Sequence, residues 1–309
     1  MHRLKELIIE LSYNCNLTCK MCGFWRKKND ERKFMSKKRF FSILKSLGPY
    51  SRTVRLNGRG ESTIHPDFIE ILDQTRGYLN DIDINLFTNL SFNDENILNA
   101  FVRNDVQLFI SIDSPFQKEL ESIRRGCDYR AIMKNIENLS DIQPRPFIIF
   151  TIMEDNLNRI RQIGDFALNH EMSIIYNVVR SDQGLEYFVE KVTAEKEDIK
   201  NDFDHVRKGY RNTDLSCIIP SQISGVDLGE RSYDQTHGQL ETCPSLGNEL
   251  CVLYNGDVIP CNMFNPYVFG NIFEQNFDDI MNGEKRKWFV NNHKEYYYCN
   301  NCACLEVKA

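Results

Sequence analysis

Short apolar runs alternate with amphipathic segments along residues 5–179. The amphipathic segments predict helices near residues 36–48, 65–79, 94–103, 116–140 and 155–170. The apolar runs are rich in β-branched and aromatic residues and predict six strands, at Glu6–Leu11, Thr53–Asn57, Ile82–Thr88, Gln107–Asp113, Phe147–Met153 and Ser173–Val179. This alternation is typical of parallel βα units with right-handed crossovers. It predicts the α/β class, with a partial (β/α)6 TIM-like barrel over residues 1–182.

The pattern changes after the last predicted strand. Residues 185–210 are charged and amphipathic, which predicts an exposed helix within a connecting segment of residues 183–215. From residue 216 to 309 the sequence is rich in turns and holds seven of the eleven cysteines. Because this region has too little periodic apolar sequence to build a core, we expect a small cysteine-rich domain organised by metal.

Charge and hydropathy narrow the choice of partners. The chain has 38 basic and 44 acidic residues, and the formal net charge of −6 argues against a broad nucleic-acid surface. No segment approaches the roughly 20 apolar residues that cross a bilayer, and the amino terminus lacks the features of a signal peptide. We therefore expect a cytoplasmic protein with a small-molecule or peptide partner, and no membrane or nucleic-acid partner.

Three cysteines follow the first predicted strand directly. An odd cysteine count, the length of the chain and the missing export signal favour metal ligands over disulfides. Thiolates at Cys15, Cys19 and Cys22 have the spacing to bind three irons of a cubane and leave the fourth iron open. Barrel-type folds place their chemistry at this end of the strands. Zinc is the alternative, although His65 is the one plausible fourth zinc ligand before residue 127.

The CxxxCxxC motif after a first strand resembles the signature of the radical S-adenosylmethionine superfamily, and the resemblance extends to about residue 180. It implies a [4Fe–4S] cluster whose open iron is chelated by S-adenosylmethionine (SAM). Reductive cleavage of SAM then yields a 5′-deoxyadenosyl radical that abstracts hydrogen from substrate. The resemblance also places Met21 against the adenine, where the family often has an aromatic residue.

A glycine-rich loop follows the second strand. Gly58 and Gly60 free the backbone for a close approach, and Glu61 offers a carboxylate to an ammonium group. The loop resembles the superfamily's GGE(P) motif, which binds the methionyl amine of SAM. Arg59 stands where the motif has glycine, and Ser62 where it has proline.

Three polar residues end or follow the next two strands. Asn89, Ser111 and Asp113 lie where the superfamily places contacts to the ribose and carboxylate of SAM. Asn and Asp also favour strand ends because they hydrogen-bond their own backbone, so turn chemistry is the alternative. Arg124 and Arg125 follow in a stretch that also resembles the family, and both are interpreted as solvated charges at a helix end.

The carboxyl-terminal cysteines form a second group. A predicted hairpin turn at Asn255-Gly256 brings its flanking runs together, and a Cys-x-x-Cys pair follows later. Four thiolates then make a closed site, at Cys243, Cys261, Cys299 and Cys302. Zinc and an iron–sulfur cluster both fit four cysteines.

This region resembles the SPASM/Twitch auxiliary-cluster domain of radical SAM enzymes. The short ending favours the Twitch form, with one auxiliary [4Fe–4S] cluster, and Cys304 is the alternative to Cys302 as the last ligand. Cys251 falls within an apolar run and is interpreted as a buried packing thiol. Cys127 and Cys217 suit the same role, but Cys217 lies near the predicted domain junction and is a candidate catalytic residue, returning hydrogen to a substrate radical.

Three functions follow as hypotheses. The first is oxidation or epimerisation of a small polar metabolite such as a sugar, aminocyclitol or nucleoside. The second is maturation of a ribosomally made peptide, and the third is a non-catalytic, zinc-stabilised binding module. Either enzyme would need an electron donor such as flavodoxin or ferredoxin.

Overall fold

The structure is a computed structural model that describes residues 4–24, 33–139, 142–179, 188–224, 226–228, 243, 245–246, 248–261 and 266–300. The described residues form two compact units. The first unit draws on residues 1–15, 28–86 and 237–309, and the second on residues 16–27 and 87–236.

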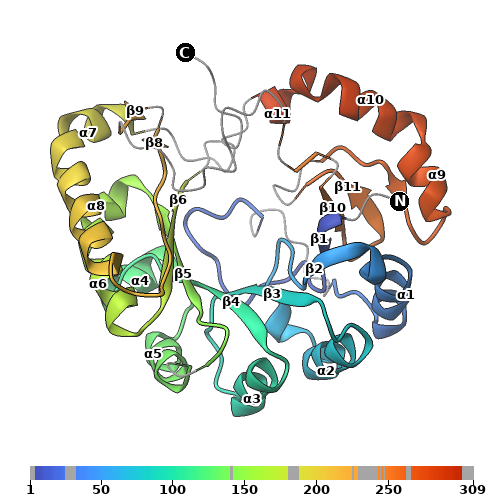
Figure 1. The fold of residues 1–309 in the computed structure, drawn as a ribbon, viewed down its shortest axis with the longest axis horizontal. Helices are drawn as coiled ribbons and strands as arrows, with labels where there is room; N and C mark the ends of the chain where they lie inside the picture. Colours follow the sequence, from blue (N-terminus) through green and yellow to red (C-terminus); the bar gives the residue numbers. More distant parts are fainter. Residues whose placement is uncertain are drawn as a thin grey trace. The chain divides into compact units, whose positions relative to one another are not determined.

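The first unit contains a mixed sheet built around β1, which is parallel to a neighbour on each side (Figure 1). The strands in order across it are β12 (Gly270–Asn271), β11 (Asp257–Ile259), β10 (Glu249–Val252), β1 (Leu4–Ile9), β2 (Ser51–Arg55) and β3 (Asp83–Thr88), the last passing into the second unit. Its helices are α1 (Lys37–Leu47), α2 (Phe68–Tyr78), α9 (Phe277–Asn282), α10 (Glu284–Asn292) and α11 (Tyr297–Asn300), with single 3₁₀ turns η2 (Gly48–Tyr50), η3 (Ser62–Ile64) and η7 (His293–Glu295).

The second unit contains a parallel sheet with helices along one face (Figure 1). Its strands are β4 (Val106–Ser111), β5 (Phe147–Ile152), β6 (Ser173–Val178) and β7 (Cys217–Ile218), and a separate pair joins β8 (Gln222–Ile223) to β9 (Val226–Asp227). Its helices are α3 (Glu95–Arg103), α4 (Gln117–Ile123), α5 (Tyr129–Asn138), η4 (Glu154–Arg159), α6 (Ile160–Asn169), α7 (Val189–Ala194) and α8 (Lys196–Tyr210).

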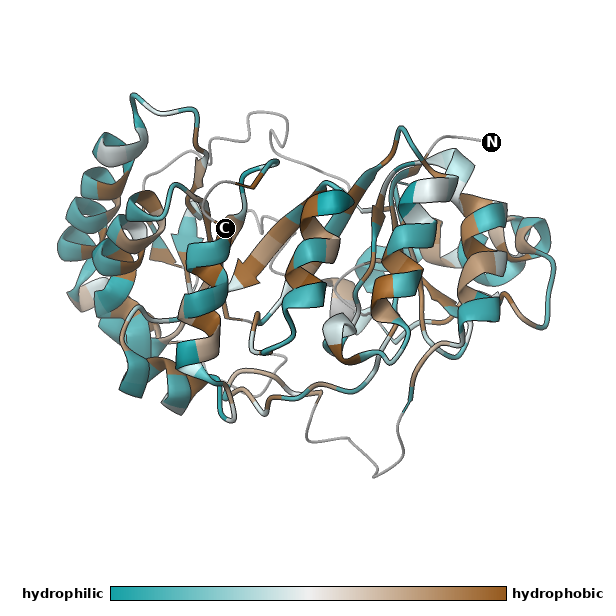
Figure 2. Cartoon of the chain, turned by 90° about the horizontal axis from the view of Figure 1, so that it is seen from below, coloured by the Kyte–Doolittle hydropathy of each residue, from teal (hydrophilic) through white to brown (hydrophobic). Residues whose placement is uncertain are grey.

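Burial alternates along the strands of the second unit, because one face of the sheet is covered by helices and the other face is open. In β4, Leu108 and Ile110 are fully buried, whereas Phe109 and Ser111 between and beyond them are half-buried. Figure 2 shows hydrophilic and hydrophobic residues sharing each helix, as expected for helices with one face against a sheet. On the covered face of β6, the Tyr176 ring lies 5.2 Å from the ring of Phe203 in α8.

The predicted α/β class and the six parallel strands are confirmed, with boundaries shifted by one or two residues. The predicted helix over 116–140 is instead two helices. Gly126 adopts a left-handed φ of +89° between them, and the Asp128 side chain caps α5 by accepting the Ala131 N–H. The predicted hairpin turn at Asn255-Gly256 joins β10 to β11, with Gly256 at φ +93°.

The compact units divide the chain differently from the predicted domains of residues 1–182, 183–215 and 216–309, and those bounds stay a prediction. The pairing of β10 with β1, in which Leu7 faces Leu250 and Ile8 faces Cys251, brings the two ends of the chain into one unit. Strands β10 and β11 of the cysteine-rich region thereby extend the sheet that contains β1. Residues from both ends of the chain then pack in one hydrophobic core. In the described part of the chain, no helix combines the length and apolar character that a membrane crossing requires.

Candidate active site

The loop carrying Cys19 and Cys22 is held by hydrogen bonds to the last residue of α4 and to the segment that follows it. The N–H of Thr18 donates to the carbonyl of Arg125 at 2.9 Å, and the N–H of Lys20 donates to the carbonyl of Ile123 at 2.8 Å. These bonds bracket Cys19, and the Cys22 N–H donates back to the Cys19 carbonyl at 3.1 Å to close a turn. Both cysteines are half-buried and lie outside any disulfide, as ligands of iron must.

Asn89 at the end of β3 secures the start of this loop. Its amide Nδ2 donates to Oδ1 of Asn16 at 2.9 Å, and its own Oδ1 accepts the Ser91 N–H. Asn16 in turn donates to the Ser91 carbonyl. The structure therefore places Asn89 against the cysteine loop, and its predicted contact with SAM stays a prediction.

A buried ion pair lies under the segment that holds the loop. The Arg124 Nε atom lies 2.8 Å from Oδ2 of Asp113, and Oδ1 of Asp113 accepts the Thr151 N–H at 2.8 Å. Burial raises the pKa of Asp113, and the charge of Arg124 opposes this shift. Burial also raises the pKa of the Cys19 thiol, again opposed by Arg124. The prediction that Arg124 is a solvated charge is wrong, because only 7% of the residue is exposed.

The two remaining cofactor candidates of the second unit differ in exposure. Met21 is buried at 7% exposure, and Ser111 is half-buried on the open face of β4. Asp113, by contrast, is fully buried: its Oδ1 accepts the Thr151 N–H and its Oδ2 lies at ion-pair distance from Arg124, so it joins segments of the protein chain. Contacts of Met21 and Ser111 with SAM remain predictions.

The glycine-rich loop of the first unit lies directly on the chain that precedes Cys15. The N–H of Glu61 donates to the carbonyl of Asn14 at 2.8 Å. A Cβ atom on Gly60 would stand 2.1 Å from that carbonyl oxygen, and a Cβ on Gly58 would stand 2.3 Å from Cγ of Glu10. Both glycines are thus required for a close approach to the protein's own chain.

The Glu61 carboxylate is buried beside Thr63. Its Oε1 accepts the Thr63 hydroxyl at 2.9 Å and the Thr63 N–H at 3.4 Å, which caps the short helix η3. These contacts fix the carboxylate at the end of a loop that adjoins residues 12–14. An acidic group is the kind of partner that the ammonium group of SAM requires, and the contact of Glu61 with SAM stays a prediction.

We expect Gly60→Ala to lower kcat/KM for SAM cleavage about 100-fold, because the added methyl forces the loop away from residues 12–14 and small displacements of binding groups are costly. The measurement is the rate of 5′-deoxyadenosine formation with dithionite. Gly77→Ala in α2 is the matched control, since a Cβ there meets nothing within 4 Å. Equal rates for the two variants would contradict the assignment of this loop to SAM.

Three of the predicted auxiliary ligands are described by the structure, and they lie in the first unit. Cys243, Cys261 and Cys299 are half-buried thiols outside any disulfide, whereas Cys302 and the alternative Cys304 lie outside the described residues. Cys251 is fully buried in a cluster with Ile8, Leu253 and Ile259, which confirms the packing-thiol interpretation. Burial raises the pKa of Cys251 well above its ordinary value.

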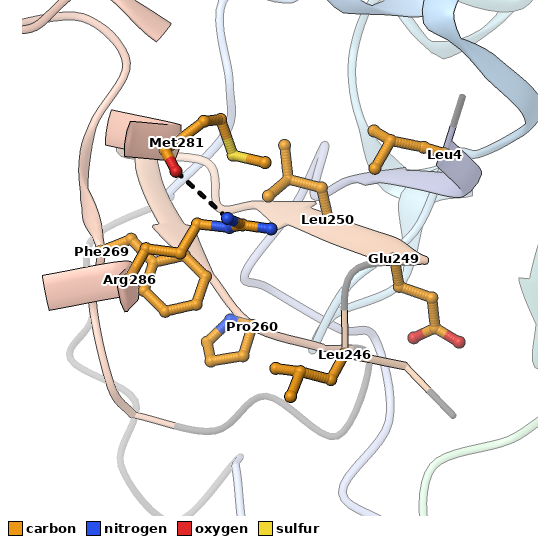
Figure 3. Close-up of a pocket in the computed structure, with 8 residues that line it drawn as sticks. All are labelled: Leu4, Leu246, Glu249, Leu250, Pro260, Phe269, Met281 and Arg286. Atoms are coloured by element: carbon orange, nitrogen blue, oxygen red, sulfur yellow. Dashed lines mark hydrogen bonds between the residues drawn. The ribbon is translucent and has the colours of Figure 1, made fainter. Parts of the chain in front are cut away.

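A small cavity lies between the hairpin and helices α9 and α10 (Figure 3). The Arg286 guanidinium enters it and donates to the Met281 carbonyl at 3.1 Å, and desolvation lowers the pKa of this arginine. The lining residues are Leu4, Leu246, Glu249, Leu250, Pro260, Phe269, Met281 and Arg286. None of the predicted ligands lines this cavity, so we assign it to packing within the unit.

The predicted hydrogen donor, Cys217, lies on the helix-covered face of the second unit. It is in register with Ile174 of β6, which shares that face with Tyr176. Burial raises the pKa of Cys217 to about 12, and the pKa values of Tyr176 and Tyr210 are raised in part by its proximity. This environment favours a packing thiol over a hydrogen donor.

We accordingly expect Cys217→Ala to retain the product yield per 5′-deoxyadenosine within about twofold of the wild-type value. Product and 5′-deoxyadenosine are quantified together by mass spectrometry. A more than tenfold fall in that ratio, with 5′-deoxyadenosine still formed, would restore Cys217 as the donor.

Two family models match the chain over most of its described length. The model of the radical SAM superfamily matches residues 9–167, and that of SPASM, an iron–sulfur cluster-binding domain, matches residues 243–303. The chain belongs to the radical SAM superfamily, and the predicted partial barrel with a small cysteine-rich domain is confirmed as its fold class. It is an enzyme whose cofactors are a [4Fe–4S] cluster, SAM and an auxiliary iron–sulfur cluster, which excludes the zinc-module hypothesis.

Individual relatives are distant but extend along the whole chain. A tungsten-containing aldehyde ferredoxin oxidoreductase cofactor-modifying protein of Pyrococcus furiosus is 23% identical, over 98% of this chain and 88% of the relative's chain. The structure of SuiB of Streptococcus suis bound to SAM is 17% identical, with a TM-score of 0.72, and the match covers 98% of this chain and 72% of the SuiB chain. BtrN in complex with SAM and 2-DOIA is also 17% identical, with a TM-score of 0.54 and coverage of 99% and 95%.

Proposed function

We propose that this enzyme oxidises a small polar metabolite, such as a sugar, aminocyclitol or nucleoside, by abstracting one hydrogen atom from carbon. The position of Cys217 favours oxidation over epimerisation. Epimerisation needs a hydrogen donor at the substrate, and the candidate thiol lies on the helix-covered face. Oxidation needs instead an acceptor for the remaining electron, and the SPASM region supplies a second cluster.

The bound cluster and SAM supply a 5′-deoxyadenosyl radical, and the protein orients and shields it. Cys15, Cys19 and Cys22 hold the cluster, on a loop that Asn89 and residues 123–125 fix. The Glu61 carboxylate receives the methionyl ammonium group, while Met21 and Ser111 contact the rest of SAM. Asn89 also positions the cysteine loop through its bonds to Asn16 and Ser91, and Asp113 positions residues 123–125 through its ion pair with Arg124.

After hydrogen abstraction, the substrate radical must lose one electron and one proton to give the two-electron oxidised product. Cys243, Cys261, Cys299 and Cys302 would hold a single Twitch-like cluster, and this cluster would supply the acceptor for that electron. A flavodoxin or ferredoxin supplies the electron that starts each turnover.

The open face of the second unit supports a cyclic polar substrate. Three half-buried phenyl rings form a row on it, with centroids 4.5 Å apart for Phe87 and Phe109 and 5.2 Å apart for Phe109 and Phe147. Ser111, which we propose contacts SAM, shares this face of β4, so the row of rings lies beside the proposed SAM site. Aromatic rings bind the C–H face of a sugar or cyclitol, or the base of a nucleoside, and adjacent polar groups bind the hydroxyls.

Peptide maturation is the second candidate. SuiB bound to its precursor peptide SuiA has a TM-score of 0.73 to this chain, and anSMEcpe has been solved with a bound peptide. The relative from Pyrococcus furiosus supports a substrate other than a peptide, because its name describes modification of a cofactor. A direct comparison of the two substrate classes therefore tests the proposal.

Deuterium transfer distinguishes the two classes. The reconstituted enzyme is incubated with SAM, dithionite and either a deuterated mixture of monosaccharides, aminocyclitols and nucleosides or a deuterated peptide digest. We expect deuterium in 5′-deoxyadenosine from the first mixture only. Deuterium from the peptide digest alone would overturn the proposal.

For whichever metabolite donates deuterium, we expect Phe109→Ala to raise the substrate KM about tenfold, because the variant loses the central ring of the row. Phe109→Leu, which keeps apolar volume, should give a smaller loss in steady-state assays. If both variants leave KM unchanged while the melting temperature is retained, the open face is not the substrate surface.

A further inference from the structure

A fully buried carboxylate lies just after β1 and binds two other segments of the first unit. Oε1 of Glu10 accepts the Arg59 backbone N–H at 2.9 Å and the Arg59 Nε at 2.8 Å. Oε2 accepts Nη2 of Arg59 at 2.7 Å and the backbone N–H of Tyr254 at 3.2 Å. One side chain therefore joins the end of β1, the glycine-rich loop and the turn of the β10–β11 hairpin.

Aromatic rings complete the same network. The Arg59 guanidinium lies 4.4 Å from the centroid of the Tyr13 ring, and the Tyr13 and Tyr254 rings are 5.7 Å apart. The planar guanidinium can bind a carboxylate with two parallel bonds while stacking on a ring, which lysine cannot do. Arg59 is therefore held on two sides at once.

Each of the three segments that Glu10 joins continues to a residue that we propose binds a cofactor. Residues 12–14 run into Cys15, and Glu61 follows Arg59 by two positions. Beyond the hairpin turn, β11 runs from Asp257 to Ile259, two residues before Cys261. The Glu10 carboxylate is thus the common contact of the loop assigned to SAM and the hairpin assigned to the auxiliary cluster.

A neighbouring ion pair provides an internal comparison. Glu6 of β1 pairs with Arg55 of β2, and Nε of Arg55 donates to Glu6 at 3.0 Å. The two arginine side chains are similarly shielded, at 16% exposure for Arg55 and 18% for Arg59. The Glu6 carboxylate also accepts Nδ2 of Asn85 in β3 at 3.4 Å, so this side-chain pair joins β1 to β2 and β3, whereas the Glu10 carboxylate also accepts the Tyr254 N–H of the hairpin.

We propose that Glu10 and Arg59 are positioning residues that couple the SAM loop to the auxiliary-cluster hairpin. SAM binding at the loop orders the hairpin through them, and an ordered hairpin tightens SAM binding in return, as linkage requires. The inference rests on the proposed function, which assigns residues 58–61 to SAM and Cys261 to the auxiliary cluster. Arg59, standing where the superfamily motif has glycine, adds this connection to a loop that otherwise serves SAM alone.

Hydrogen–deuterium exchange on the anaerobically reconstituted enzyme tests the coupling without measuring turnover. In wild type, we expect SAM to slow amide exchange in residues 58–61 and in residues 253–257. In Arg59→Ala the hairpin should exchange about tenfold faster without SAM, and SAM should no longer slow it. Arg59→Lys should fall between these values, and Arg55→Ala should keep the wild-type pattern in the hairpin.

Two results would overturn the coupling. If Arg59→Ala and Arg55→Ala alter hairpin exchange equally, the Glu10 network is a general support of the sheet. If SAM slows exchange in residues 58–61 of wild type but leaves residues 253–257 unchanged, the two segments are independent while the proposed function stands. If SAM slows exchange at neither segment, the assignment of the loop to SAM fails, and the coupling with it.

Discussion

Replacing Cys15, Cys19 and Cys22 together with alanine should abolish 5′-deoxyadenosine formation and leave about half of the bound iron. The first loss is expected because these thiolates are the ligands proposed for the cluster that reduces SAM. The iron that remains belongs to the auxiliary cysteines, which lie more than 200 positions further along the chain. The measurement is iron per chain and 5′-deoxyadenosine after anaerobic reconstitution.

The control for this variant also removes cysteines, from positions outside both proposed ligand sets. The double variant Cys127→Ala, Cys217→Ala should keep the full iron content and the rate of SAM cleavage. Burial raises the pKa of these thiols to about 11 and about 12, so neither is readily ionised to bind iron. Normal 5′-deoxyadenosine formation by the triple variant would refute the ligand assignment.

Arg124→Ala should lower the free energy of unfolding by about 3–5 kcal/mol, because it leaves the Asp113 carboxylate buried without its partner. We expect this variant also to bind less iron at the first cluster, since residues 123–125 hold the backbone on both sides of Cys19. Urea unfolding and the iron count measure the two effects. A loss below 1 kcal/mol would show that the pair is solvated.

The pH dependence of this variant has a definite sign. Burial holds the pKa of Asp113 above its unfolded value, and removal of Arg124 raises it further. An acid with a raised folded pKa binds its proton more tightly when folded, so stability increases as pH falls through that pKa. The deficit of Arg124→Ala should therefore shrink on acidification, and adding Asp113→Asn should recover part of it at neutral pH.

Local sequence signals predicted the elements and the cysteine sites. Period-2 and period-3.6 patterns located the six parallel strands and most helices, because each element buries a regular face. The break at Gly126 was missed because the segment 116–140 remains amphipathic on both sides of it. A glycine followed two positions later by an aspartate that caps the next helix was the available signal.

Long-range pairings were beyond sequence reasoning. Arg124 looked like a helix-end charge because nothing in the local sequence reveals that Asp113 lies beneath it. Glu10 and Arg59 are 49 positions apart, and their partner Tyr254 is 244 positions from Glu10. The local sign of a buried partner was Glu10 itself, a charged residue inside the apolar run of the first predicted strand. The pairing of β10 with β1 likewise depends on the tertiary fold.

The most direct test of the central claim is the anaerobic reconstitution of the wild-type chain with iron and sulfide, followed by reaction with SAM and dithionite. We expect about eight irons per chain, as two [4Fe–4S] clusters, together with equal amounts of 5′-deoxyadenosine and methionine. Four or fewer irons per chain, or no 5′-deoxyadenosine from fully loaded protein, would contradict it.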